Sequence, residues 1–428
     1  MKSKELSYNP LETLFIGIDV SKDSNQVCFM NFSQKKLASF SSRNNLDGAK
    51  LIEERILSVL DDNKELNKVL VILESTGIYS LHIANYLSTV ESLISKGIEL
   101  YVVNPVSTAN YSKVLREFSK NDPNDAYALA DFIRSGHTKD MIPFRGAQRL
   151  SLQRLTRHRK HIVELLSREK EYVLNNIFLK FSDFNNARHE CRTFSNTFSE
   201  TSTQVLLKFN SPEAIANMKL DRLVELLVKY SKNKFSNPEE VAKTLQKAAR
   251  SSFRLDKTSY DSLNIAIASS LSLIDAYEGQ IREIDEAISK LVSGLDNVNQ
   301  YKALMSVSGI GPVFAAGILS EIGDANYFNS DDALAKYIGL TWKERQSGNY
   351  SSEDTPLTKA GNSYLRYYII EATSSVICSL SEYADFYLKK KGEVTVHSHS
   401  RAIVLTSRKL VRLIYSLMSN NKLFQVNK

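Results

Sequence analysis

Residues 14–32 read LFIGIDVSKDSNQVCFMNF, and this stretch decides the fold. Its two apolar runs, residues 14–20 and 26–32, are rich in β-branched residues and flank turn-forming residues at 21–25. This pattern predicts a β-hairpin. A third run at Lys36–Phe40 predicts another antiparallel strand beside it.

After this hairpin the chain alternates between helix and strand patterns. Apolar residues spaced three and four apart over 46–60 predict a helix, and Val69–Leu73 and Ile98–Val103 predict buried strands. Three more helices are expected, from Ile78, around 106–118 and at 124–134. Three antiparallel strands followed by helix-separated strands predict a mixed sheet with helices on its faces, the layout of ribonuclease-H-like nucleases.

The rest of the chain is predicted to be helical. Helical spacing recurs over 146–178 and 258–296, and we expect these long helices to pair as an antiparallel coiled coil. The segment 180–260 is polar, weakly helical and interrupted by prolines, which indicates a small helical module of unknown role. The fold class is therefore α/β plus α. The expected domains are an α/β domain at 1–145, a helical middle at 146–300 and a C-terminal helical domain at 301–428.

Composition indicates a globular protein with an anionic partner. The chain has 428 residues, a formal net charge of +7 and 24% charged residues, which excludes a disordered polyelectrolyte. Its three cysteines, Cys28, Cys191 and Cys378, are too few and too far apart for a disulfide framework. The sequence shows no apolar leader and no apolar stretch long enough to span a membrane, so we expect a cytoplasmic protein.

Four carboxylates stand where a nuclease of this layout needs them. Asp19 ends the first strand and Glu74 ends the fourth, while Asp122 and Asp125 lie at a helix start. Such acids repel one another unless divalent cations lie among them, and oxygen ligands suit Mg²⁺ or, as the alternative, Mn²⁺. Taken singly, each acid is typical of a helix cap or a surface residue, but together they predict a metal cluster. Two neighbouring acids rank below these four, Asp23 and Asp131.

Two features predict contact with nucleic-acid phosphates. The helix expected after residue 145 is cationic, with no Asp or Glu between Met141 and Val163, although such runs are usually solvated helix faces. Its cations are Arg145, Arg149, Arg154, Arg157, Arg159 and Lys160. Gly309 and Gly311 precede a helix that starts with proline, which is typical of a helix-hairpin-helix whose backbone N–H groups bind a phosphate. The alternative is a glycine turn between two packed helices.

Four segments of the N-terminal third resemble a known family. They read GIDVSK (17–22), ESTGIY (74–79), GIELYVVNP (97–105) and KNDPNDAYALADF (120–132). They are similar to the DEDD transposase domain of insertion-sequence-110-type transposases, which are related to the Piv site-specific invertases. The resemblance implies a RuvC-like domain whose metal-binding acids are Asp19, Glu74, Asp122 and Asp125. Where the family pattern has Thr before the third acid, this chain has Asn121.

The C-terminal part resembles the second conserved domain of the same family. Residues 337–372 read YIGLTWKERQSGNYSSEDTPLTKAGNSYLRYYIIEA and carry its Gln-Ser-Gly segment and its Lys-x-Gly-Asn before an Arg-bearing helix. The resemblance implies that Ser347 is a nucleophile that attacks a DNA phosphate, whereas composition alone favours a Ser-Gly turn. Three cations are expected to contact phosphates, Arg345, Lys359 and Arg366. The single tryptophan, Trp342, is expected to be a core anchor rather than a base-stacking surface.

We therefore expect a transposase that cleaves and exchanges DNA strands with Mg²⁺ through a serine–DNA intermediate. The resemblance also implies guidance by a bridge-type RNA, and the cationic helix at 145–160 would offer its charge to that RNA. It further implies a composite site, in which the acids of one subunit meet Ser347 of another. This requires a homo-oligomer, a dimer or tetramer, with the coiled coil as the assembly element.

Three other functions fit parts of the sequence. A RuvC-like endonuclease would hydrolyse structured DNA with water as the nucleophile and would not need Ser347. A nucleic-acid-binding scaffold would use the cationic helix and the glycine hairpin alone. A sugar or acetate kinase of the related actin-like fold shares the GIDxxK-like opening, but no glycine-rich phosphate loop follows residue 125.

Overall fold

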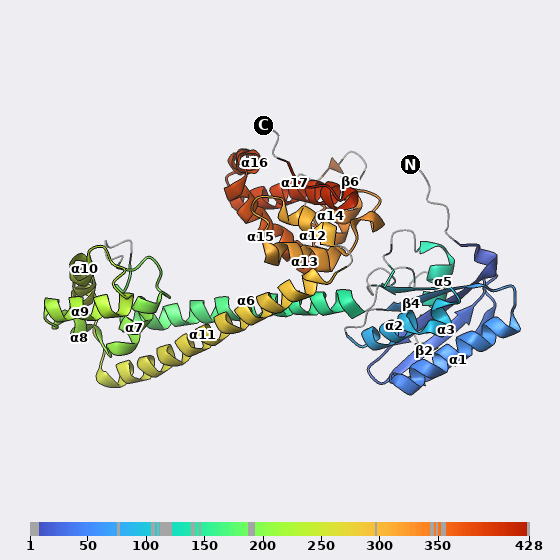
Figure 1. The fold of residues 1–428 in the computed structure, drawn as a ribbon, viewed down its shortest axis with the longest axis horizontal. Helices are drawn as coiled ribbons and strands as arrows, with labels where there is room; N and C mark the ends of the chain where they lie inside the picture. Colours follow the sequence, from blue (N-terminus) through green and yellow to red (C-terminus); the bar gives the residue numbers. More distant parts are fainter. Residues whose placement is uncertain are drawn as a thin grey trace. The chain divides into compact units, whose positions relative to one another are not determined.

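The computed structural model has a five-stranded sheet near the N-terminus and helices over most of the remaining chain (Figure 1). It describes residues 8–74, 78–103, 108, 111, 122–137, 141, 143–144, 147–186, 193–295, 298–342, 346–347, 350–351 and 357–425. For residues 122–123, 147–149, 346–347 and 350–351 it describes the main chain alone. The chain divides into two compact units, residues 1–154 with 291–428, and residues 155–290. No helix in the described ranges is long and apolar enough to cross a membrane.

The sheet has the strand order β3-β2-β1-β4-β5. β1 (Thr13–Val20), β2 (Ser24–Met30) and β3 (Lys36–Arg43) are antiparallel neighbours, as the hairpin pattern predicted. β4 (Lys68–Glu74) pairs with β1 in parallel, and β5 (Ile98–Val103) pairs with β4 in parallel. The predicted mixed sheet is therefore confirmed.

Helices cover both faces of this sheet. α1 (Leu46–Asp62) and α2 (Ser80–Thr89) share a core with the even-numbered residues of β1, such as Ile16. α5 (Asp122–Arg134) covers the other face, where Phe15 lies. This division follows from the alternation of side chains along a strand. The short α3 (Glu91–Ile94) and the 3₁₀ helix η1 (Pro10–Glu12) complete this part of the fold.

The helices expected at 46–60, from Ile78 and at 124–134 are all present. The helix expected around 106–118 lies outside the described residues, apart from Thr108 and Tyr111.

Gly17 lets α5 lie directly on β1. A Cβ atom at this position would lie 2.2 Å from the carbonyl oxygen of Ala126 and 2.4 Å from the backbone nitrogen of Ala130. Real side chains do not approach backbone atoms so closely, so any other residue would push the helix away from the strand. The glycine of the GIDVSK segment thus brings the helix that carries Asp122 and Asp125 onto the strand that carries Asp19.

Residues 155–290 have their own helical core. They include most of α6 (Ala147–Lys180) and α11 (Lys257–Ser293). Arg159 forms an ion pair with Asp285, and Lys170 forms one with Glu278, so the two long helices run antiparallel. The antiparallel pairing is therefore present, and the supercoil of a coiled coil stays a prediction.

The described residues of the segment 180–260, which was predicted to be a small helical module, contain four short helices. These are α7 (Glu200–Lys208), α8 (Pro212–Ala216), α9 (Leu220–Ser231) and α10 (Pro238–Ser251). Their apolar faces form one core with the adjoining ends of α6 and α11.

The C-terminal part is a helical domain around one core. Its helices are α12 (Val298–Met305), α13 (Pro312–Ile322), η4 (Ala325–Tyr327), α14 (Asp331–Ile338), α15 (Ser363–Ser379), α16 (Ser381–Gly392) and α17 (Ser398–Asn420). Two short strands, β6 (Gln346–Ser347) and β7 (Tyr350–Ser351), lie between α14 and α15 in the sequence. The domain boundaries expected at residues 145 and 300 stay predictions.

Candidate active site

Strands β1 and β4 place two carboxylate residues side by side. The parallel register pairs Ile18 with Leu73, so the next position along both strands pairs Asp19 with Glu74. Neighbouring strands lie about 4.8 Å apart. Both residues have the parity of the strand positions that pack against α5. Asp19 and Glu74 therefore lie together on the α5 face, at the edge where both strands end.

Helix α5 brings a third carboxylate residue to this edge. The last turn of α5 contacts the β2–β3 turn, while Ala126 lies against Gly17, so α5 runs antiparallel to β1. The first turn of α5 therefore lies towards the end of β1, where Asp19 is. Asp125 is in this turn and is half-buried, as Asp19 is. Asp122 begins the same helix, and only its main chain is described.

Thr108 is a contact of this site that the sequence did not predict. Its hydroxyl donates a hydrogen bond of 3.0 Å to Oε1 of Glu74, and its side chain is 3% exposed. A buried hydroxyl in this place orients the carboxylate and leaves its second oxygen available to a ligand. No signal in the sequence distinguishes Thr108 from other polar residues of the segment, so only the structure could identify it.

The carboxylates at this edge fit a divalent cation in donor type and charge. Half-buried carboxylates close together repel one another, and oxygen donors of this kind suit Mg²⁺ or Mn²⁺. Among the described side chains, which include those of Asp19, Glu74 and Asp125, no group of three or more His, Cys, Asp or Glu could hold a metal ion. The side chain of Asp122 is outside that set. The four-acid site predicted from the sequence therefore stays a prediction.

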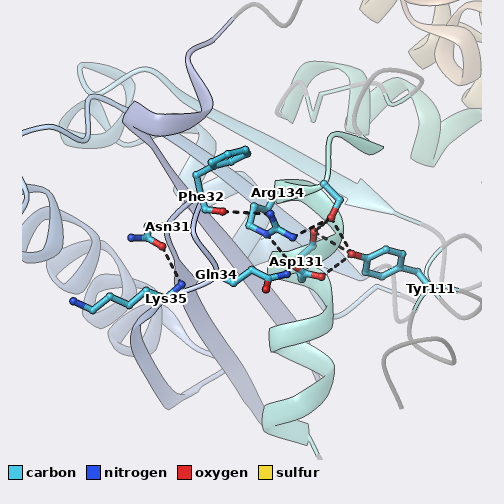
Figure 2. Close-up of polar contacts among 8 residues, drawn as sticks. Asn31, Phe32, Gln34, Lys35, Tyr111, Asp131 and Arg134 are labelled. Atoms are coloured by element: carbon cyan, nitrogen blue, oxygen red, sulfur yellow. Dashed lines mark hydrogen bonds and ion pairs between the residues drawn. The ribbon is translucent and has the colours of Figure 1, made fainter. Parts of the chain in front are cut away.

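Asp131 lies at the opposite end of the strands from Asp19, near the β2–β3 turn, and has a structural role (Figure 2). It is 2% exposed and accepts hydrogen bonds from Nε of Arg134 at 2.7 Å, the Tyr111 hydroxyl at 2.6 Å and Nε2 of Gln34 at 3.2 Å. Arg134 also donates to the carbonyl oxygen of Phe32 at 3.3 Å. These contacts fasten the C-terminal end of α5 to the β2–β3 turn, which explains why this acid ranks below the predicted ligands.

The predicted nucleophile lies at the end of a short β-hairpin. Ser347 pairs with Tyr350, so only residues 348 and 349 connect the two strands. Near the start of the hairpin, the backbone N–H of Thr358 donates to the carbonyl oxygen of Thr341 at 2.8 Å. The main chain therefore presents Ser347 at the tip of a loop whose two ends are joined. The role of Ser347 itself stays a prediction.

Trp342 lies at the base of this hairpin, and the expectation that it anchors the core was wrong. Its side chain is 37% exposed, and its main chain forms an isolated β-bridge with Leu357. Its bridge partner, Leu357, packs against the core of the C-terminal helical domain instead.

The Lys-x-Gly-Asn segment fastens the hairpin to the helical domain through Asn362. The Asn362 carboxamide oxygen accepts from the backbone N–H groups of Tyr364 and Leu365, both at 3.0 Å, and so caps α15. The amide group of the same side chain donates to Oε2 of Glu321 at 2.7 Å. Glu321 is fully buried in α13. One side chain therefore starts a helix and ties it to a buried carboxylate.

Arg366 has a structural contact that the sequence analysis did not anticipate. Its Nη1 donates to the carbonyl oxygens of Ile338 at 2.9 Å and Lys359 at 3.1 Å. Burial lowers the pKa of Arg366 from its ordinary value. Phosphate contact by Arg366 stays a prediction, as it does for the exposed Lys359. Arg345 lies outside the described residues.

Gly309 lies where α15 leaves no room for a side chain. Its φ is +98°, and a Cβ atom there would lie 2.7 Å from the Cα of Val376. This is the packing of a glycine turn between helices, which was the alternative to phosphate binding. Gly311 precedes α13, and a Cβ atom there would meet nothing within 4 Å. Phosphate binding by the two glycines stays a prediction.

Some cations of the cationic helix form ion pairs with acids of the same chain. Nε of Arg159 lies 2.5 Å from Oδ1 of Asp285 in α11, and Lys160 pairs with Glu164 one turn later. The absence of acids between residues 141 and 163 did not reveal these partners, because they come from outside that stretch. Arg154 is exposed and Arg157 is half-buried, whereas the side chains of Arg145 and Arg149 lie outside the described set. Nucleic-acid contact by these cations stays a prediction.

Two family models match the chain over the two parts that carry the predicted residues. A transposase model matches residues 16–181, which include the carboxylate residues, and a model of the IS116/IS110/IS902 transposase family matches residues 301–388, which include Ser347. The chain belongs to the IS110 family of transposases.

Relatives of this IS110-family transposase include both transposition and inversion proteins. An uncharacterised protein of insertion element IS116 from Streptomyces clavuligerus is 21% identical over 96% of each chain. The pilin gene-inverting protein of Moraxella bovis is 26% identical over 40% of this chain and 53% of its own length. The transposase for insertion sequence element IS1111A of Coxiella burnetii is 20% identical over 55% of this chain and 68% of its own length. The protein is therefore an enzyme of the transposase and site-specific recombinase class.

Proposed function

We propose that this transposase cleaves DNA at a divalent-metal site held by Asp19, Glu74, Asp122 and Asp125, and that Ser347 becomes joined to the cut strand. One observation carries the proposal. The register of β1 and β4 sets Asp19 beside Glu74, on the face and at the edge where α5 begins. A RuvC-like fold for this domain agrees with the strand order and with the parallel pairing of β1, β4 and β5.

The acids would bind and orient the scissile phosphate through the cation they share. Mg²⁺, with Mn²⁺ as the alternative, would stabilise the charge that develops on the phosphate oxygens. Thr108 fixes one oxygen of Glu74, and Gly17 fixes the distance between α5 and β1. These two contacts hold the carboxylates ready before DNA arrives.

The serine step conserves the number of phosphodiester bonds. The Ser347 oxygen forms a bond to phosphorus and loses its proton, while the bond from phosphorus to one deoxyribose oxygen breaks and that oxygen takes up a proton. Attack by a DNA hydroxyl in the reverse sense would release the serine and rejoin the strands. A hairpin with joined ends suits this role, since it fixes the main chain of Ser347.

The same proposal includes the assembly and the guide. The acids of one subunit and Ser347 of another would form a composite site in a cytoplasmic homo-oligomer, a dimer or tetramer, assembled through α6 and α11. A bridge-type RNA would bind the cationic stretch of α6, where the exposed Arg154 supports a phosphate contact. The helix-hairpin-helix at Gly309 and Gly311 would bind DNA phosphates.

The decisive experiment traps the serine–DNA bond. We would incubate the purified protein, with its copurifying RNA and Mg²⁺, with a plasmid that carries its gene and the flanking DNA. Denaturing electrophoresis should then show a covalent adduct of the protein and the cut DNA strand. Ser347→Ala should abolish the adduct, whereas the control Ser351→Ala, in the same hairpin, should retain it.

The acids are tested in the same assay. Asp19→Asn should reduce cleavage by roughly a thousandfold or more, because one partner of a shared cation is lost, with DNA affinity largely unchanged. Strand cleavage that proceeds without an adduct and is indifferent to Ser347→Ala would instead establish a hydrolytic endonuclease. Full cleavage by Asp19→Asn would contradict the metal site.

A further inference from the structure

We propose that Gln26, Ser41 and Arg43 form a binding site for the backbone of the DNA strand that is cut. These residues, here named the β2–β3 ledge, lie on β2 and β3 next to the carboxylate residues. The inference rests on the proposed function of Asp19 and its partners and adds a substrate-binding surface to it.

The strand register places the ledge beside the acids. Asp19 pairs with Gln26 across the antiparallel β1–β2 ladder, and Gln26 pairs with Ser41 across the β2–β3 ladder. Paired residues point to the same face of a sheet. Glu74, Asp19, Gln26 and Ser41 therefore form one row across four strands, with the two acids at one end and the two neutral residues at the other.

The ledge is open on the face that α5 covers elsewhere. α5 packs on β1 and β2. The core between them includes Cys28, which lies two residues before the buried C-terminal end of β2. Gln26 is half-buried, whereas Ser41 and Arg43 on the edge strand β3 are exposed. A strand of DNA could therefore reach the carboxylate row along the ledge without displacing α5.

The side chains of the ledge are hydrogen-bond donors in an arrangement that suits phosphate. Nε2 of Gln26 donates to Oγ of Ser41 at 3.2 Å, which orients the amide beside Asp19. Amide, hydroxyl and guanidinium groups are the side-chain donors that proteins use on phosphate and sugar oxygens. Strands β2 and β3 contain no Asp or Glu, so nothing on them repels an anion.

The main chain of Arg43 is fixed at the site edge. Arg43 pairs with Ser24, beyond the level of Asp19, and its carbonyl oxygen accepts from Nδ2 of the buried Asn25 at 3.2 Å. The start of α1 lies against it, because a Cβ on Gly48 would be 1.9 Å from the same oxygen. No ion pair of its guanidinium is found among the described residues. A fixed backbone with an exposed cation suits a phosphate next to the one that is cut.

We assign the ledge to DNA rather than RNA because it continues the row of acids that, in the proposed function, act on DNA. A carboxylate row by itself repels the phosphates it must receive. Donors on the adjoining strands offset this repulsion without entering the metal site. β3 is an edge strand of the sheet, which leaves room for the DNA strand to continue past Arg43.

The test compares Arg43, on the sheet, with an arginine of α1, the helix that packs on the other face of the sheet. Arg43→Ala removes the charge from the ledge, and Arg55→Ala removes an exposed arginine from α1, on the other face. Fluorescence anisotropy would measure binding of a fluorescein-labelled DNA duplex with a single-stranded gap, in EDTA, over a range of salt concentrations. Arg43→Ala should weaken binding about fivefold to tenfold and reduce the slope of log affinity against log salt by about one.

Two control variants separate a phosphate contact on the ledge from a general loss of positive charge. Arg55→Ala should leave affinity and slope unchanged, and Arg43→Lys should restore the slope, because it keeps the charge. Equal effects of Arg43→Ala and Arg55→Ala would overturn the ledge. If Arg43→Ala weakened the binding of a gapped RNA duplex of the same sequence by the same factor, the assignment of the ledge to DNA would be overturned.

A second variant tests the neutral part of the ledge. Gln26→Met keeps the length of the side chain and removes its donors. Cleavage at subsaturating DNA should fall about tenfold, as expected for one lost hydrogen bond to a charged group, while the salt slope stays the same. The DNA must be subsaturating because saturating DNA would mask the loss of a binding contact. An unchanged cleavage rate would remove Gln26 from the ledge. Because the binding assay contains no divalent cation, failure of the ledge is distinguishable from failure of the metal site, which the Asp19→Asn cleavage assay tests.

Discussion

At the scale of single residues, Gly17 shows how one missing side chain sets the geometry of a site. It lies two residues before Asp19 on the same face of β1, and the backbone of α5 occupies the space where a Cβ would be. The separation between the strand that carries Asp19 and the helix that carries Asp125 is therefore set by a contact between main chains. Such a contact does not depend on a rotamer.

Gly17→Ala should destabilise the protein and reduce cleavage more than it reduces DNA binding. The added methyl group would overlap the Ala126 carbonyl, and overpacking of this kind costs about 1–3 kcal/mol. Urea denaturation and the cleavage assay would measure the two effects. Gly392→Ala is the control, since a Cβ at Gly392 meets nothing within 4 Å. Equal stability of the two variants would contradict the close approach of α5.

Lys180 is a second residue whose surroundings can be tested. Its side chain is 2% exposed and donates to the carbonyl oxygen of Leu206 at 2.7 Å. Burial lowers the pKa of Lys180 from 10.5 to about 8. The unfolded chain therefore binds more protons than the folded one between these values, so stability rises with pH through this window, and the cost of burying the charge is fully present below it.

Lys180→Met should stabilise residues 155–290 at neutral pH. Removing the buried charge gains more than the lost hydrogen bond costs, and we expect a net gain of about 1–2 kcal/mol. Urea denaturation, monitored through a fluorescent label on α9, would measure the free energy of unfolding of the variant and of the natural sequence. The measurement is made at about pH 7 and at about pH 10. The gain should shrink at the higher pH. A gain that is independent of pH would show that the pKa of Lys180 is the same in the folded and the unfolded chain.

At the scale of elements, α15 connects the hairpin of Ser347 to the core of the C-terminal domain. Its cap, Asn362, also binds the buried Glu321, and the N–H of Asn362 donates to the carbonyl oxygen of Tyr337 at 2.8 Å. The helix start is therefore linked to α13 and to the end of α14. The hairpin is held at this junction, so damage to the cap should displace the serine.

Asn362→Ala should lower stability and adduct formation together. Loss of the cap costs about 1 kcal/mol, and the loss of a donor to buried Glu321 costs about 1–3 kcal/mol more. Ser330→Ala is the matched control, because Ser330 caps α14 through the N–H of Ala333 without a buried carboxylate partner in the described contacts of its side chain. If both variants form the adduct at the same rate, the cap does not position the hairpin.

Much of the fold, and part of the candidate site, follows from the sequence at this scale. The apolar runs of β1, β4 and β5 and the helical spacing of α1 and α11 are local signals, and the structure has these elements where they were expected. The pairing of Asp19 with Glu74 follows from parallel strands that end at the same level. Partners that come from distant segments have no local signal, as for Thr108 on Glu74. The exposure of Trp342 could not be predicted either, because burial depends on which layer covers a strand.

At the scale of the whole molecule, residues 155–290 interrupt the first unit of the chain and are joined to it by α6 and α11. The ion pairs Arg159–Asp285 and Lys170–Glu278 set the two helices in antiparallel register. Deleting two turns, about seven residues, from each helix would keep the same faces in contact. The paired helices can therefore be shortened in steps of two turns while the ion-paired faces stay matched, so their length is not fixed by their pairing.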